Sequence, residues 1–125
     1  MDMKITFSFE FYDLARSEYC LSRWEQDQIK RALERLKELN SNTFNELYGK
    51  ASVLHFHQVD RAKTNEKHGF AGGRAEQFND NAWQIALLSV NGQKTRMYGG
   101  YVNNVFYIVW FDLNHSIWPS YLKHT

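Results

Sequence analysis

The sequence contains a single cysteine, a single proline and no long apolar run among its 125 residues. There is no second cysteine to pair with Cys20, so the fold does not depend on an oxidising compartment. A helix needs roughly 20 consecutive apolar residues to cross a bilayer, and the N-terminus lacks the apolar segment of a secretory signal. We therefore expect a cytoplasmic protein that has no membrane contact and no disulfide.

Neither sign of charge dominates the sequence, which has a net charge of +1. The positive charge is unevenly placed, because residues 50–74 carry five basic and two acidic side chains. Aromatic residues make up 16% of the chain, which either fills a compact core or provides surfaces on which bases stack. A basic middle and many aromatic rings favour an anionic partner.

No repeat, low-complexity tract or linker divides the chain, so we predict one domain over residues 1–125. Apolar and polar residues alternate over Lys4–Phe11, which predicts a strand with one buried face. Ser22 and Glu25 have the spacing of a capping box before a helix of about 17 residues. Its expected buried stripe consists of Ile29, Ala32, Leu33, Leu36 and Leu39. Thr43 and Glu46 repeat the capping pattern before a short helix that Gly49 could end.

The second half of the chain predicts strands rather than helices. Four strands are expected over 53–59, 83–90, 93–102 and 105–111, with a polar connection over 60–82. Asn91-Gly92 is a strong hairpin signal, and Asn103-Asn104 offers a second tight turn. The fold class is therefore α+β: an N-terminal strand, two helices and a C-terminal antiparallel meander, with the helices packed on one face.

Two-residue turns would fix which side chains share each face of the meander. In that register Met97, Phe106, Ile108 and Trp110 lie on the face toward the helices. The opposite, open face would carry Ile85, Leu87, Lys94, Arg96, Tyr98, Tyr107, Val109 and Phe111. A bulge at Gly99-Gly100 would break this register.

Lys94, Arg96, Tyr98 and Tyr107 are the most informative group on the open face. Cations bind phosphate and tyrosine rings stack on unpaired bases. Cleavage of RNA requires deprotonation of a 2′-hydroxyl, neutralisation of the developing charge and protonation of the leaving oxygen, roles that Lys, Arg, Tyr and His can fill. The alternative is a solvent-facing surface whose charges keep the protein in solution.

His115 lies just beyond the last expected strand, where an imidazole could act as a general acid or base. Asp112 could orient His115, or it could instead cap the turn through the backbone. Both interpretations remain open at this point.

The connection after residue 59 supplies Arg61, Lys63 and Arg74, which could hold a substrate if this loop lies beside the meander. It lacks the pattern of a phosphate-binding loop, so a solvated loop is the alternative. His55 and His57 could share a metal, but one such pair demands none, and we expect neither a metal nor another cofactor.

The element order, together with the stretch from Lys94 to Tyr98 and that from Val105 to Phe111, resembles the RelE/ParE superfamily of bacterial toxins. RelE-like members cleave mRNA in the ribosomal A site, and ParE-like members act on DNA gyrase. The resemblance implies a metal-independent endoribonuclease, with Arg96 as phosphate ligand and Lys94, Tyr107 and His115 as further catalytic candidates. Tyr98, Arg61, Lys63 and Arg74 are the substrate-binding candidates. The implied partners are RNA, on or off the ribosome, and a neutralising antitoxin protein; the alternative is a non-catalytic module that binds protein or nucleic acid through the same face.

Overall fold

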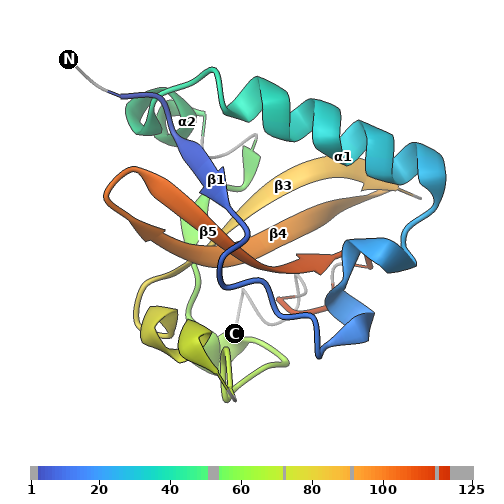
Figure 1. Cartoon of the computed structure of the whole chain (residues 1–125), viewed down its shortest axis with the longest axis vertical. Coiled ribbons are helices and arrows are strands. Elements are labelled where there is room, and N and C mark those ends of the chain that lie inside the picture. The colour runs from blue at the N-terminus through green and yellow to red at the C-terminus, as the bar shows by residue number, and fades with distance from the viewer. Residues whose placement is uncertain (1–2, 51–53, 72, 91, 115, 119–125) are drawn as a thin grey trace.

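The computed structural model describes residues 3–50, 54–71, 73–90, 92–114 and 116–118. It has the predicted α+β architecture, with a five-stranded mixed sheet in the order β1-β5-β4-β3-β2 and both helices on one side of it (Figure 1). The helices are α1 (Gln26–Leu39) and α2 (Phe44–Gly49). The strands are β1 (Thr6–Ser8), β2 (His57–Gln58), β3 (Ala82–Val90), β4 (Gln93–Val102) and β5 (Val105–Asp112). None of the helices in these ranges is long and apolar enough to span a bilayer.

The three long strands form the antiparallel meander that the sequence predicted. At one edge β1 pairs with β5 in parallel, and at the other edge β2 pairs with β3 over only two residues. The strands expected over 4–11 and 53–59 are thus shorter than predicted, and residues 51–53 lie outside the described residues. His55 has a φ of 53°, in the left-handed region, so an extended strand begins only after it.

Helix α1 begins differently from the prediction. The predicted cap at Ser22 is wrong, because Leu21–Arg23 form a short 3₁₀ turn and Trp24 is buried. Glu25 caps the helix instead, and its backbone N–H donates to the Gln28 side chain at 2.9 Å. Ala32, Leu36 and Leu39 are buried as expected, whereas Leu33 is 53% exposed.

Helix α2 follows the sequence closely. Thr43 accepts a hydrogen bond from the Glu46 backbone, and the Thr43 backbone N–H donates to the Glu46 carboxylate. The predicted capping box is therefore confirmed, and the helix ends at Gly49 as expected.

Two bulges change the predicted register. Val90 pairs with Gln93 and Ser89 with Lys94, as the hairpin signal predicted, but a shift before Ser89 then sets Ala86 opposite Arg96. A second shift, at the predicted Gly99 position, leaves Val109 as an extra residue between the partners of Tyr98 and Gly99. A Cβ at Gly99 would collide with the Tyr107 carbonyl oxygen, which explains glycine there.

These bulges change which side chains lie in the core on each side of the sheet. Met97, Phe106 and Ile108 pack on the helix side with Leu36, as predicted. Trp110 was predicted beside them but lies on the opposite face, where it contacts Phe70 and Tyr19. Three residues predicted on the open face lie in the helix-side core: Ile85, Leu87 and Phe111.

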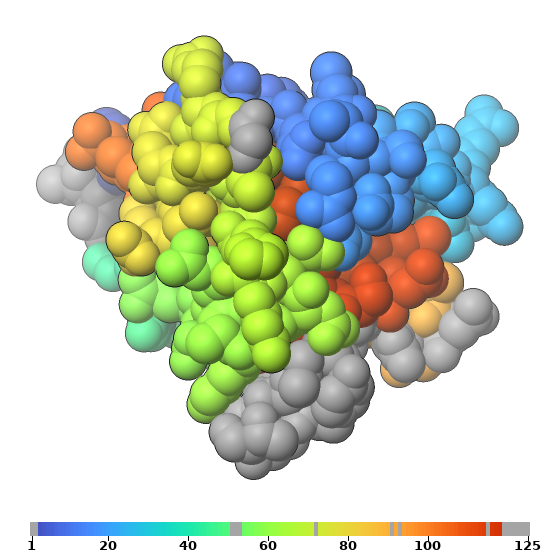
Figure 2. All heavy atoms as spheres, turned by 90° about the horizontal axis from the view of Figure 1, so that it is seen from below, coloured from blue at the N-terminus to red at the C-terminus, as the bar shows by residue number. Residues whose placement is uncertain are grey.

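The sheet face away from the helices is covered, so the predicted open face is wrong. A second apolar cluster lies there, made by Tyr98, Val109 and Trp110 with Phe70, Phe78, Tyr19 and Ile117. The covering residues come from the N-terminal segment, from residues 60–82 and from residue 117, and two short 3₁₀ helices, Arg61–Lys63 and Arg74–Phe78, lie within the connection. Figure 2 looks onto this side, where the N-terminal segment and the connection lie next to each other.

Candidate functional site

The two central residues of the predicted site are buried. Arg96 is 3% exposed and Tyr98 is 2% exposed, and both lie in β4. Burial raises the pKa of Tyr98 well above its usual value, and the charge of Asp112 raises it further. Tyr98 is therefore a neutral core residue, and in this conformation its ring is not available to stack on a base.

Arg96 has few partners for a buried cation. Its Nη1 donates to the Lys94 carbonyl oxygen at 2.5 Å, whereas its Nε has no hydrogen-bond partner among the residues that the structure describes. Burial lowers the pKa of Arg96, and the neighbouring Tyr98 and Asp112 oppose that shift. Arginine stays charged over the ordinary pH range, so a positive charge is held below the surface at this end of the sheet.

Lys94 precedes Arg96 by two residues in β4 and is half-buried. Side chains two residues apart in a strand point to the same face, although the register irregularity in the facing strand β3 lies close by. Lys94 and Arg96 are thus neighbours near the start of β4, and the printed contact between them runs from the Arg96 guanidinium to the Lys94 backbone.

Asp112 lies opposite Arg96 at the end of β5 and is almost fully buried. Its Oδ1 accepts hydrogen bonds from the backbone N–H and the hydroxyl of Ser116, at 3.0 and 3.1 Å. Its Oδ2 accepts one from the Ile117 backbone N–H at 2.8 Å. Of the two interpretations left open by the sequence, these bonds support turn capping. His115 lies outside the described residues.

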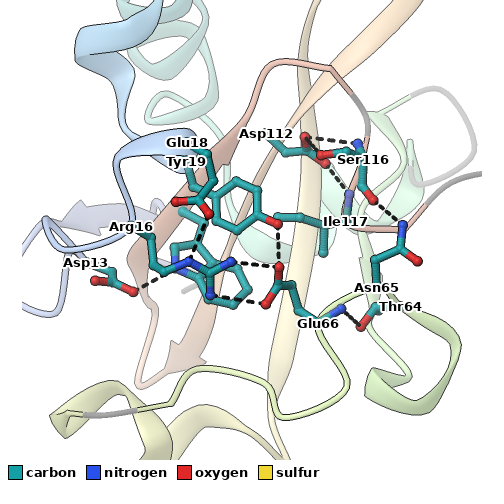
Figure 3. A network of polar contacts seen from close by, with 11 residues as sticks. Asp13, Arg16, Glu18, Tyr19, Thr64, Asn65, Glu66, Asp112, Ser116 and Ile117 are labelled. Carbon is teal, nitrogen blue, oxygen red and sulfur yellow. Dashed lines mark hydrogen bonds and ion pairs between the residues drawn. The ribbon is translucent and has the colours of Figure 1, made fainter.

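A polar network joins the N-terminal segment to the connection on the covered face (Figure 3). The guanidinium of Arg16 forms two hydrogen bonds to the Glu66 carboxylate, at 3.1 and 2.8 Å, and the Tyr19 hydroxyl donates to the same carboxylate at 2.5 Å. The Arg16 guanidinium also lies over the rings of Tyr19 and Trp110. We call Arg16, Tyr19 and Glu66 the Glu66 network.

The protonation states in the Glu66 network follow from these contacts. Burial by itself would raise the pKa of Glu66, but hydrogen bonds from Arg16 and Tyr19 outweigh it and the pKa is lowered. The pKa of Arg16 is raised, chiefly by its hydrogen bonds to Glu66. Near neutral pH the pair is therefore an ion pair with matched geometry.

The Glu66 network is connected to the turn that Asp112 caps. Asn65 donates its backbone N–H to the Ile117 carbonyl oxygen at 2.8 Å and its side-chain amide to the Ser116 carbonyl oxygen at 2.7 Å. Arg16 and Glu66 are 50 residues apart in sequence, so no motif spacing could have revealed their contact. The only sequence signal was an arginine and a glutamate among many.

The remaining predicted residues do not join the Arg96 site. Tyr107 stacks on Phe78 with ring centroids 5.3 Å apart and contributes to the packing under the sheet. Arg61 and Lys63 lie in the 3₁₀ helix at 61–63. Arg74 is exposed, forms an ion pair with Glu10 at 3.0 Å and lies over the Phe11 ring. Arg61 lines the same small cavity as Tyr98, whereas Arg74 lines the groove beside Glu10. The structure therefore brings Arg61 near Tyr98 and places Arg74 apart from them.

Two concave sites adjoin the covered face. An open groove of about 310 Å³ runs between residues 10–15 and residues 70, 71 and 73–75. Its charged lining residues, Glu10, Asp13 and Arg74, give it a net negative charge, which disfavours a phosphate there. A more apolar cavity of only about 20 Å³ lies beside Glu66, Tyr98 and Trp110. Among the described residues, no three His, Cys, Asp or Glu side chains are grouped closely enough to hold a metal ion.

Comparisons with known proteins identify no relative. No family model, no curated protein and no solved structure matches this chain. The resemblance to the RelE/ParE superfamily remains a prediction from the sequence, and function must be argued from the residues themselves.

Proposed function

We propose that this protein is a toxin-like endoribonuclease that cleaves RNA phosphodiester bonds without a metal and is neutralised by an antitoxin protein. The observation that carries the proposal is the guanidinium of Arg96, which is buried beside Lys94 with its Nε unpartnered among the described residues. A buried charge without full compensation destabilises a fold, so its presence calls for another explanation. A phosphate oxygen is the natural partner for such a donor.

The chemistry needs three roles. A base removes the proton of a 2′-hydroxyl, whose oxygen then attacks the phosphorus and displaces the 5′-oxygen, which takes up a proton. Arg96 and Lys94 neutralise the charge that develops on the non-bridging oxygens. His115, three residues after Asp112 in the sequence, is the proposed proton-transfer group, because imidazole exchanges protons near neutral pH.

Access sets a condition on this mechanism. Arg96 is 3% exposed, so a phosphate reaches it only after the residues that cover it move. Asp112 holds the adjoining turn by three hydrogen bonds. We therefore expect RNA binding to be accompanied by a movement of the residues that cover Arg96.

Induced expression in bacteria tests the proposal. The wild-type protein should arrest growth, Arg96→Met should not, and Arg23→Ala, which removes an exposed arginine, should arrest growth like the wild type. The purified wild type should cleave RNA in the presence of a chelator, alone or with ribosomes added. Equal toxicity of the wild type and Arg96→Met, or no cleavage under any of these conditions, would overturn the proposal.

A non-catalytic binding module is the second candidate, and the burial of both Arg96 and Tyr98 favours it. In that case Arg61, Lys63 and Arg74 of the connection would supply the contacts to a nucleic acid or an acidic protein. A gel-shift assay with intact RNA recovered afterwards would support this function, and cleaved RNA would exclude it.

A further inference from the structure

We propose that Glu66, held by Arg16, is a positioning residue that fixes the 112–117 turn at the Arg96 end of the sheet. This inference rests on the proposed function for its catalytic consequence, but its structural part can be tested without that function. It concerns a residue that no sequence motif marks, in the middle of the connection over 60–82.

The contacts form a continuous path. Arg16 and Tyr19 hold the Glu66 carboxylate by three hydrogen bonds. The Glu66 backbone N–H donates to the Thr64 hydroxyl at 3.1 Å, which fixes the local chain between them. Asn65, between Thr64 and Glu66, then bonds the turn at two carbonyl oxygens. Figure 3 shows the whole path, from Arg16 to Asp112.

The two ends of the path have different tasks. Asp112 determines the shape of the turn, because it bonds the backbone N–H groups of Ser116 and Ile117. Asn65 determines where the turn lies relative to the connection, because it bonds carbonyl oxygens of the same two residues. The Glu66 network in turn holds Asn65 against the N-terminal segment. A loss of Glu66 would leave the turn formed but free to shift.

The geometry of the Glu66 network indicates that it holds the two segments together and does more than balance charge at the surface. The side chains of Arg16 and Glu66 are 33% and 20% exposed, and the contact is bidentate. Partly buried pairs of this geometry are held more firmly than exposed pairs. The pair of Arg74 with Glu10 joins the same two segments but is more exposed and shows no bond to the turn. Glu10 therefore provides a matched control.

The test compares Glu66→Gln with Glu10→Gln. Hydrogen exchange should show that Glu66→Gln speeds exchange of the Asn65 amide, which donates to the Ile117 carbonyl oxygen, at least tenfold. The Ser116 and Ile117 amides, which Asp112 holds, and the β3–β4 amides should stay unchanged. Glu10→Gln should leave all of these amides unchanged. The charge-reversed double variant R16E/E66R should restore at least part of the protection, because it restores the ion pair.

The catalytic consequence is measured on an RNA substrate. Glu66→Gln should lower kcat at least tenfold with little change in KM, since Ser116 and Ile117, which follow His115 in the sequence, are displaced while Arg96 stays in β4. Unchanged exchange at Asn65, or equal acceleration over the whole sheet, would overturn the positioning role. Local exchange that accelerates while kcat stays constant would overturn its catalytic part. Absence of cleavage by the wild type would defeat the proposed function instead, and the exchange result would still decide whether Glu66 holds the turn.

Discussion

Arg96 and Asp112 lie directly opposite each other in neighbouring strands, yet the Asp112 carboxylate accepts its hydrogen bonds from Ser116 and Ile117. The aspartate shapes the turn that follows β5, and the arginine keeps an Nε that has no partner within the described part of the chain. A cation beside a carboxylate that is otherwise engaged is poorly compensated, and this makes Arg96 the best candidate for contact with an anion.

Replacement of Arg96 by methionine should therefore preserve or increase stability. Methionine fills a similar volume and removes a buried cation whose Nε has no hydrogen-bond partner among the described residues, so the desolvation cost that it relieves offsets the lost attraction to Asp112. Urea denaturation followed by fluorescence measures the free energy of unfolding. A loss of more than about 2 kcal/mol would mean that Arg96 is a structural residue.

Truncation of Trp110 to alanine should leave little folded protein. Its ring is 2% exposed, packs against Phe70 and Tyr19, and donates from Nε1 to Asp13 at 3.0 Å. Truncation of a large buried aromatic residue costs about 3–5 kcal/mol, comparable with the whole stability of a small domain. Circular dichroism of the variant checks this. A melting temperature like that of the wild type would show that packing on the covered face contributes little to the stability of the fold.

Acid should destabilise the fold partly through Glu66. Its pKa in the folded protein is below the ordinary value of 4.5, because Arg16 and Tyr19 bond the carboxylate and His68 adds a favourable charge, against the opposing effect of burial. Its contribution is complete above pH 4.5 and is lost as the pH falls through the lowered value. Unfolding measured between pH 3 and 6 should show a weaker pH dependence for Glu66→Gln than for the wild type. Identical slopes would contradict the prediction.

Molecules should associate through the outer edge of β3 when two arginines that cover it are removed. Beyond Gln84 no strand of the described chain pairs with this edge, and α1 covers it with Arg31 and Arg35, which donate to the Ser89 and Leu87 carbonyl oxygens. Side chains of this kind protect sheet edges from pairing with other chains. The double variant R31A/R35A should form dimers or aggregates in light scattering, and the control K30A/K37A, on the same helix, should stay like the wild type.

Two glycines should respond oppositely to alanine. A Cβ at Gly99 would strike the Tyr107 carbonyl oxygen, so Gly99→Ala should lower the free energy of unfolding by about 1–3 kcal/mol. Nothing lies within 4 Å of a Cβ at Gly49, at the end of α2, so Gly49→Ala should raise the free energy of unfolding by up to about 1 kcal/mol. Thermal melts of the two variants check the contrast. A stable Gly99→Ala would show that the bulge in β5 relaxes easily.

Local chemistry in the sequence determined several elements of this protein. The Thr43 capping box, the pairing of Val90 with Gln93 and the turn at 103–104 formed as predicted, because each depends on residues within four positions of one another. The alternation of apolar residues likewise indicated the three strands of the meander, and α1 was expected from its helical spacing.

The tertiary structure decided what these elements present to a ligand. Because of the bulge at Val109, Trp110 and Phe111 each lie on the face opposite to the one predicted for them, since a single extra residue inverts the alternation that follows it. The pairing of Arg16 with Glu66 and the cover over Arg96 depend on segments far apart in sequence, for which spacing carries no signal. The sequence therefore predicted which residues could do chemistry, and long-range packing decided which of them are accessible.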